Sequence, residues 1–212
     1  LQQQRYRSGV RETGSSSDFA TAGASQKLAV VRTSVGTLDT DYAPERDFYK
    51  QFRDAIKAGV RSGDDVAQVR RAADRASVRR QDHYRSLSAS WNAWRGDRDL
   101  DATSLRGTWG ESGLTVNVRP TFVCHNNNGV DDLILIHYKS EALNRDAVQA
   151  VIRLMELTLP AAAGRPAVLD LRRRRLHHAS TSRQRDMDLW LAAEAASFVV
   201  MFTSLAQAAR AH

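Results

Sequence analysis

The fold of this chain is decided by residues 114–171, which are LTVNVRPTFVCHNNNGVDDLILIHYKSEALNRDAVQAVIRLMELTLPAAAGRPAVLDL. From Leu114 to Cys124, apolar and polar side chains alternate with the period of two expected of a half-buried strand. The run from His125 to Gly129 predicts a hairpin turn, because Asn and Gly tolerate the left-handed backbone that such a turn needs. Val130–Lys139 is then a second strand, and its central apolar run indicates burial on both faces.

A helix and a third strand follow. Glu141–Leu159 carries apolar residues at helical spacing, and the prolines and glycine of residues 160–166 end it. Ala167–Leu171 is the third strand. Together with the N-terminal half, the pattern predicts an α/β (α+β) fold: a helical N-terminal half packed on a small mixed β-sheet, with a long C-terminal helix.

The N-terminal half contains a polar arm and then helices. Residues 1–40 are rich in Ser, Gly, Thr and Gln, which favours a flexible arm, although Lys27–Val35 has the composition of an extra strand. A helix beginning at Pro44 and ending near Gly63 is expected from the apolar residues Phe48, Phe52, Ile56 and Val60 at a spacing of four.

A second helical segment opens at Asp64-Asp65 and stops at Gly96. Trp91 and Trp94 share one face of it, which predicts core packing, with an aromatic platform for nucleic-acid bases as the alternative. The residues expected to point inward are Val66, Val69, Ala73, Ala76 and Val78. The outer face carries Arg70, Arg71, Arg75, Arg79 and Arg80.

The C-terminal residues 180–211 predict one long helix, capped by Ser180, Thr181 or Ser182. Its apolar segment Leu189–Leu205 contains Glu194 and is shorter than the roughly 20 residues that span a bilayer, so we expect a buried helix and no membrane. Residues 41–212 are predicted to form a single domain after the arm, consisting of a helical part (41–96), the core (114–171) and the C-terminal helix (180–211).

Charge and cysteine content narrow the class of protein. The net charge of +7 and the pI of about 10.1 favour anionic partners, with nucleic acid first. Most of the basic residues are arginines, which suit bidentate phosphate contacts, although a GC-rich coding bias produces the same excess. The single cysteine, Cys124, fits a reducing, cytoplasmic location and is expected to be a buried small hydrophobe. The chain opens without a signal-peptide pattern.

Two tripeptides in the core suggest a family. Arg119-Pro120-Thr121 lies in the first core strand, and His137-Tyr138-Lys139 ends the second. With the order of elements, they resemble the PD-(D/E)XK nuclease-like superfamily, in which a metal-binding Asp and a (D/E)-X-K triplet hold Mg²⁺ and activate water. Here Thr121 and His137 stand where carboxylates are expected, and Lys139 matches. The resemblance implies Lys139 and His137 as candidate catalytic residues, with no metal ligands assigned and Mg²⁺ required only if the protein is an active nuclease.

Other chemistry has less support. The sequence contains no Cys/His zinc spacing, no phosphate-binding glycine loop and no nucleophile-elbow motif. The other acids near the core strands do not complete a metal site; Asp131, for example, lies roughly 20 Å from His137 along an extended strand.

The strongest charge signal is the run Arg172-Arg173-Arg174-Arg175 at the end of the third strand, where two arginines would lie on each face. With Arg71, Arg75 and Arg79 it forms the predicted nucleic-acid-binding set, the alternative being a solvated edge that blocks strand pairing. The leading hypothesis is a non-catalytic protein that binds DNA or RNA. A protein-interaction subunit or homo-oligomer and a divergent metal-dependent nuclease remain open.

Overall fold

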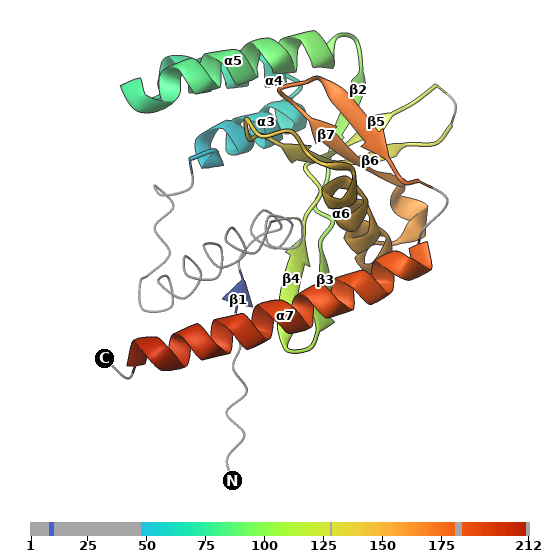
Figure 1. Cartoon of the computed structure of the whole chain (residues 1–212). Helices are drawn as coiled ribbons and strands as arrows, with labels where there is room; N and C mark the ends of the chain where they lie inside the picture. The colour runs from blue at the N-terminus through green and yellow to red at the C-terminus, as the bar shows by residue number, and fades with distance from the viewer. Residues whose placement is uncertain (1–8, 11–47, 128, 181–183, 211–212) are drawn as a thin grey trace.

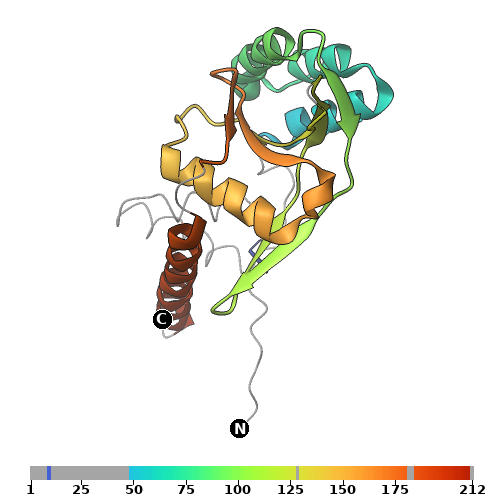
Figure 2. The same cartoon turned by 90° about the vertical axis from the view of Figure 1, so that its right-hand side faces the viewer.

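The computed structural model describes residues 9–10, 48–127, 129–180 and 184–210, and it has the predicted α+β architecture (Figure 1). A layer of three helices covers one face of a mixed sheet: α3 (Lys50–Ser62), α4 (Asp65–Asp74) and α5 (Val78–Arg95). On the other face lie α6 (Arg145–Thr158) and, outside it, the long C-terminal helix α7 (Gln184–Arg210), as Figures 1 and 2 show.

The strands form two sheets. The larger sheet has the order β2-β5-β6-β7-β8, in which only β6 and β7 run parallel. Its strands are β2 (Asp99–Ala102), β5 (Phe122–His125), β6 (Asp132–His137), β7 (Arg165–Asp170) and β8 (Arg175–His178). The smaller sheet has the order β1-β4-β3, with strands β1 (Gly9–Val10), β4 (Leu114–Val118) and β3 (Gly107–Glu111). A 3₁₀ turn, Ala161–Ala163, precedes β7.

The prediction of one strand over Leu114–Cys124 is wrong, because the chain breaks at Arg119-Pro120-Thr121 into β4 and β5, which belong to different sheets. Proline has no backbone N–H to donate to a ladder. Pairing with β6 begins at Thr121, whose N–H donates to the Ile134 carbonyl at 2.6 Å. The break also changes which core the strand fills: β4 packs toward α6 and α7, whereas Phe122 and Cys124 of β5 pack toward α3–α5.

The rest of the predicted core is confirmed. β5 and β6 form an antiparallel hairpin, and Gly129 has a φ of 77° in its turn. The Asn144 side chain caps α6 by accepting the Ala147 N–H at 2.7 Å. β7 then returns parallel to β6, so that β6, α6 and β7 form a strand–helix–strand unit.

The helical layer differs from the prediction in two respects. A three-residue turn, Arg75-Ala76-Ser77, divides the second helical segment into α4 and α5. Val66 and Val78, which were expected inside, are exposed, Val78 by 91%. Val78 is the first residue of α5, on the side opposite the buried face of the helix. Trp91 and Trp94 do pack in the core beside Phe122, which confirms the packing prediction and excludes them as a base platform.

A buried carboxylate joins α4 to α5. Asp65 is 5% exposed and accepts hydrogen bonds from Trp91 Nε1 at 2.8 Å and from Arg95 Nε at 3.2 Å. Glycine is required opposite it, because a Cβ atom at Gly59 would overlap the Asp65 backbone. A buried charge is stable only when it is paired and hydrogen-bonded, as Asp65 is.

The prediction that Leu189–Leu205 is buried is wrong. Among residues 186–208 of α7, only Leu191, Ala195 and Phe198 are buried, while Leu189 is 71% exposed and Val200 66%. By length and composition, Asp186–Ala208 could cross a membrane, and 17% of its most apolar stretch is buried in the structure. The same criteria are met by core helices of soluble proteins.

Some predictions fall outside the described residues. These are the arm over residues 1–40 apart from β1, the strand Lys27–Val35, the helix start at Pro44, and the caps Thr181 and Ser182. Cys124 is buried as predicted, and burial raises the pKa of its thiol.

We expect Asp65→Ala to lower the free energy of unfolding by roughly 3 kcal/mol, because the Arg95 charge and the Trp91 indole N–H lose their partner. The matched control is the neighbouring Asp64→Ala, which removes an exposed pair with Arg71 and should cost less than about 1 kcal/mol. Urea unfolding measures both. Equal losses would contradict a buried anchoring role for Asp65.

His125 should make stability depend on pH. Its Nε2 lies 3.0 Å from a carboxylate oxygen of Asp101, and its Nδ1 lies 3.0 Å from a carboxylate oxygen of Asp131. These hydrogen bonds raise the pKa of His125 above its usual value. Because the pKa is raised in the folded state, the stabilisation is present at low pH and is lost as pH rises through that raised pKa. We expect His125→Gln to lower the free energy of unfolding at pH 6 but hardly at pH 9. A loss that is equal at both pH values would contradict this.

Candidate nucleic-acid interface

The arginine run forms a turn and not a strand end, which corrects the prediction of two arginines on each face. Residues 171–174 connect β7 to β8, Arg174 has a left-handed φ of 54°, and only Arg175 lies in a strand. The turn is tight because β7 and β8 form an antiparallel pair in which Asp170 lies opposite Arg175.

Two of the four arginines hold this turn in place. Arg172 Nε donates to the Tyr138 carbonyl at 2.9 Å, and its Nη2 lies 3.4 Å from His83 Nδ1 of α5. Arg173 pairs with Asp170 at 3.2 Å and donates to the Ser140 carbonyl at 2.8 Å. Arg172 therefore fixes the turn between α5 and the end of β6, and Arg173 fixes it to the segment after β6.

The other two arginines face solvent. Arg174 and Arg175 are exposed, and in the part of the chain that the structure describes neither side chain forms an ion pair or a hydrogen bond. Their guanidinium groups are therefore available to a ligand without breaking a contact of the fold.

The candidate catalytic residues lie at this same end of the sheet. His137 ends β6, and its Nε2 donates to the Glu141 carbonyl at 2.9 Å. Lys139 is half-buried and follows Tyr138, whose carbonyl binds Arg172. Two predicted sets, the pair His137 and Lys139 and the run Arg172–Arg175, are thus brought together at the carboxyl ends of the parallel strands β6 and β7.

One carboxylate at this end was missed from the sequence. Asp170 lies directly beside His137 in the β6–β7 register and is 1% exposed. The sequence contains one signal for it: Asp170 is the only acid in its apolar strand, and four arginines follow that strand closely. Its carboxylate is already paired with Arg173, and Thr121, where the family has Asp, is buried with a hydroxyl. Among the described residues, no group of three His, Cys, Asp or Glu side chains could hold a metal ion.

The arginines of the helical layer flank α5. Arg79 lies one helical turn before His83 and therefore on the same side as the β7–β8 turn, whereas Arg71 of α4 and Arg75 of the turn after it lie on the other side. Arg71 pairs with the exposed Asp64 at 2.7 Å. Arg75 and Arg79 are exposed, with no side-chain partner among the residues described.

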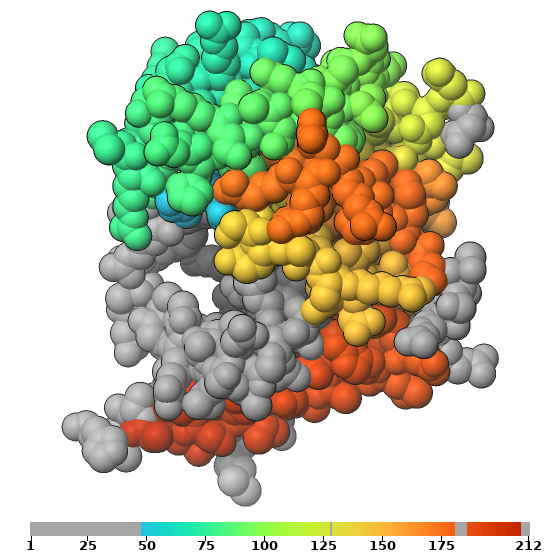
Figure 3. Space-filling model, turned by 45° about the horizontal axis from the view of Figure 1, so that its top comes forward, coloured from blue at the N-terminus to red at the C-terminus, as the bar shows by residue number. Residues whose placement is uncertain are grey.

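Most of the excess charge belongs to this layer. Residues 48–96 contain eleven Arg and Lys against five Asp, a net charge of +6 (11 − 5), where the whole chain carries +7. Figure 3 shows the face on which the β7–β8 residues, in orange, lie between green α5 and the amber residues before α6. The exposed arginines Arg174 and Arg175 of the turn give this face a positive charge.

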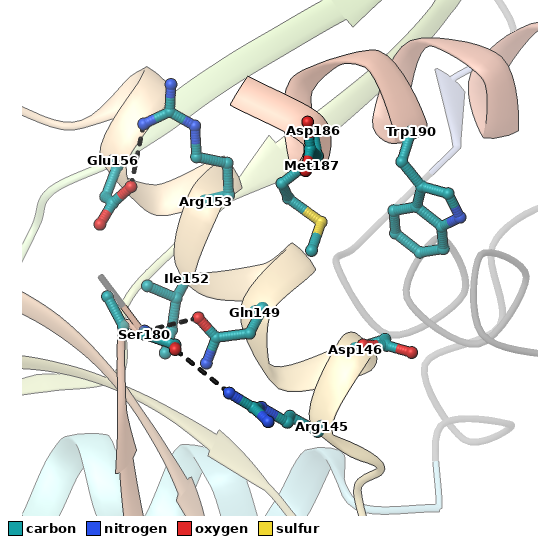
Figure 4. A pocket seen from close by; sticks show the side chains of 11 residues that line it. Arg145, Asp146, Gln149, Ile152, Arg153, Glu156, Ser180, Asp186, Met187 and Trp190 are labelled. Carbon is teal, nitrogen blue, oxygen red and sulfur yellow. Dashed lines mark hydrogen bonds and ion pairs between the residues drawn. The ribbon is translucent and has the colours of Figure 1, made fainter. Parts of the chain in front are cut away.

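A separate pocket of about 350 Å³ lies between α6 and α7 (Figure 4). Its polar groups serve the fold. Gln149 accepts the Ser180 N–H at 2.7 Å and donates to the His178 carbonyl at 3.2 Å. Arg153 makes a bidentate pair with Asp188 of α7, which lowers the pKa of that carboxyl. The remaining lining mixes Arg145 with acids and a tryptophan, and does not select one sign of charge.

Comparison with protein-family models, with curated proteins and with solved structures found no match for the chain. The resemblance to the nuclease-like superfamily therefore stays a prediction. What the chain offers for a functional interpretation is the geometry and charge of its own surface.

Neighbouring arginines of the turn should differ sharply in their effect on stability. We expect Arg173→Ala to lower the free energy of unfolding by roughly 2–3 kcal/mol, because it leaves the buried Asp170 carboxylate with the backbone N–H of residue 173 but without a positive charge. Arg174→Ala, at the exposed neighbouring position, should change it by less than about 0.5 kcal/mol. Chemical denaturation measures both values. Equal effects would show that Arg173 does not anchor the turn.

Proposed function

We propose that this protein binds nucleic acid through its phosphate backbone, using the β7–β8 turn and the arginines beside α5. The observation that carries the proposal is the division of labour in the turn. Arg172 and Arg173 fix its position, and Arg174 and Arg175 are left exposed in the turn that contacts α5 on the side of Arg79. Guanidinium groups held on a rigid support lose little freedom on binding a phosphate.

The donor groups at the end of β6 favour binding over hydrolysis. A metal-dependent nuclease needs carboxylate oxygens that are open to a divalent cation. Here the position expected to hold Asp is Thr121, and the carboxylate of Asp170 is engaged by Arg173. His137 donates a hydrogen bond from Nε2 to the Glu141 backbone carbonyl. We therefore propose a binding protein that does not cleave its ligand, and for such a role a cytoplasmic location fits the single cysteine.

A second candidate is a subunit that binds another protein through α7. Two observations favour it. Leu189 and Val200 are exposed although they are apolar, and Glu194 is the only charged residue from Leu189 to Ala209. The salt dependence of binding distinguishes the two candidates. Binding to phosphates weakens steeply as the salt concentration rises, whereas an apolar contact made by a helix does not.

The test is fluorescence anisotropy with short DNA and RNA, single- and double-stranded, between about 50 and 300 mM salt. We expect Arg174→Glu/Arg175→Glu to weaken binding at least tenfold, and to reduce the slope of log K against log salt by about 2, because two phosphate contacts are lost. Adding Mn²⁺ should leave the nucleic acid uncut.

The matched control is Arg61→Glu/Arg106→Glu, which changes the net charge by the same amount elsewhere. Arg61 lies at the far end of α3 from Tyr49, which stacks on Tyr138, and Arg106 follows β2, at the opposite sheet edge from β8. Absence of binding by the wild-type protein at low salt would refute the proposal and direct the search to a protein partner. So would equal weakening by both double variants.

A further inference from the structure

We propose that α5 is a groove-reading helix that enters the major groove of B-form DNA, with the flanking arginines on the two phosphate backbones. This inference rests on the proposed function and adds to it the class of nucleic acid and the element that contacts the bases. Its first observation is the connection: α4 and α5 are joined by three residues, the length found in helix–turn–helix units.

The outward face of α5 is open along the whole helix. Tyr84, Leu87, Trp91 and Trp94 point into the core. The opposite face consists of exposed residues at helical spacing: Val78, Asp82, Arg85, Ala89 and Asn92. Eighteen residues extend for about 27 Å, and a helix of roughly 10–12 Å diameter matches the width of the B-form major groove, about 12 Å.

The side chains on that face are of two kinds. Near the start of α5, Val78, Asp82 and Arg85 supply an apolar group, an acceptor and a donor, the groups that contact the thymine methyl, cytosine N4 and guanine N7/O6. Asp82 and Arg85 form an exposed ion pair at 3.9 Å, and such a weak pair can be exchanged for contacts with bases. Beyond Arg85 the exposed side chains of Ser86 and Ala89 are small, so that the backbone of α5 can lie close to the floor of a DNA groove. Val78 is 91% exposed although it is apolar, and groove contact would cover it.

The neighbours of α5 place positive charge on both of its sides. Asp65 of α4 binds Trp91 and Arg95 on one side, and Arg172 of the β7–β8 turn touches His83 on the other. Figure 2 shows green α5 between the orange tip of this hairpin and the blue-green helices. Arg70 of α4 and Arg75 of the turn after it therefore lie on one side of α5, and Arg174 and Arg175 lie on the other, as the two phosphate backbones flank a groove.

The aromatic side chains of the layer argue against single strands as the ligand. Binding of unpaired bases uses exposed rings for stacking. In the described part of the helical layer, Phe48 and Tyr49 are packed against other rings, and Tyr84, Trp91 and Trp94 are buried. Duplex RNA fits less well than DNA, because its major groove is deep and narrow.

The test places a large side chain on the outward face. Ala89→Trp should weaken binding of a 20-base-pair DNA duplex by about tenfold or more, since the indole would obstruct the groove. The matched control is Ala193→Trp at an exposed position of α7, on the other side of the molecule, and it should bind like wild type. Ser86→Trp repeats the test on α5, and thermal unfolding verifies that all three variants fold.

Sequence preference gives the second measurement. Selection from a random library of DNA duplexes should enrich a sequence motif with the wild-type protein. Arg85→Ala should lower the preference for the selected base at one position of that motif by roughly 5- to 100-fold. Duplex RNA should bind more weakly than DNA.

The outcomes separate this inference from the proposed function. If wild type binds duplex DNA, and Arg174→Glu/Arg175→Glu weakens binding while Ala89→Trp and Ser86→Trp do not, phosphates are contacted but α5 does not enter the groove, which overturns the inference alone. Preference for duplex RNA over DNA also overturns it alone. No binding by wild type overturns both.

Discussion

The pairing of buried aspartates with arginines fixes the parts of this fold relative to one another. In the described chain the buried carboxylates are Asp65, Asp132 and Asp170, and each lies within 3.2 Å of an arginine nitrogen. Arg95 ties α5 to α4, Arg165 ties β7 to β6, and Arg173 closes the β7–β8 turn. A buried charge that lost its partner would be strongly unfavourable, so these three contacts restrict how the layers can be arranged.

This pairing also explains why the arginine excess overstates the size of the candidate nucleic-acid interface. Four consecutive arginines look equivalent in the sequence, and all four were predicted to bind nucleic acid. Their roles diverge because Asp170 is buried beside His137 and because Tyr138 and Ser140 present carbonyls to the turn. Only the three-dimensional register distinguishes Arg173, which neutralises a buried acid, from Arg174 beside it.

The local patterns predicted the fold class and the order of the core elements, because periods of two and 3.6 record which side chains meet the core. They failed where the outcome depends on partners distant in sequence. The apolar alternation continues through Pro120, and the proline marks where a ladder can be interrupted. The local pattern does not show that β4 and β5 belong to different sheets. The contact between Arg172 and His83 joins residues 89 positions apart, and it is this contact that assembles the candidate interface.

The distribution of charge about the sheet places the two candidate functions on different faces. The core beneath α3–α5 and the core beneath α6 and α7 use opposite sides of the same strands: Ile134 and Ala167 point to the first, Leu133 and Val168 to the second. The helices on the first side carry nearly all the net charge, and α7 on the second side is almost uncharged between Leu189 and Ala209. A protein contact on α7 would therefore leave the arginine face open, and the sheet between them would keep either surface rigid when the other is occupied.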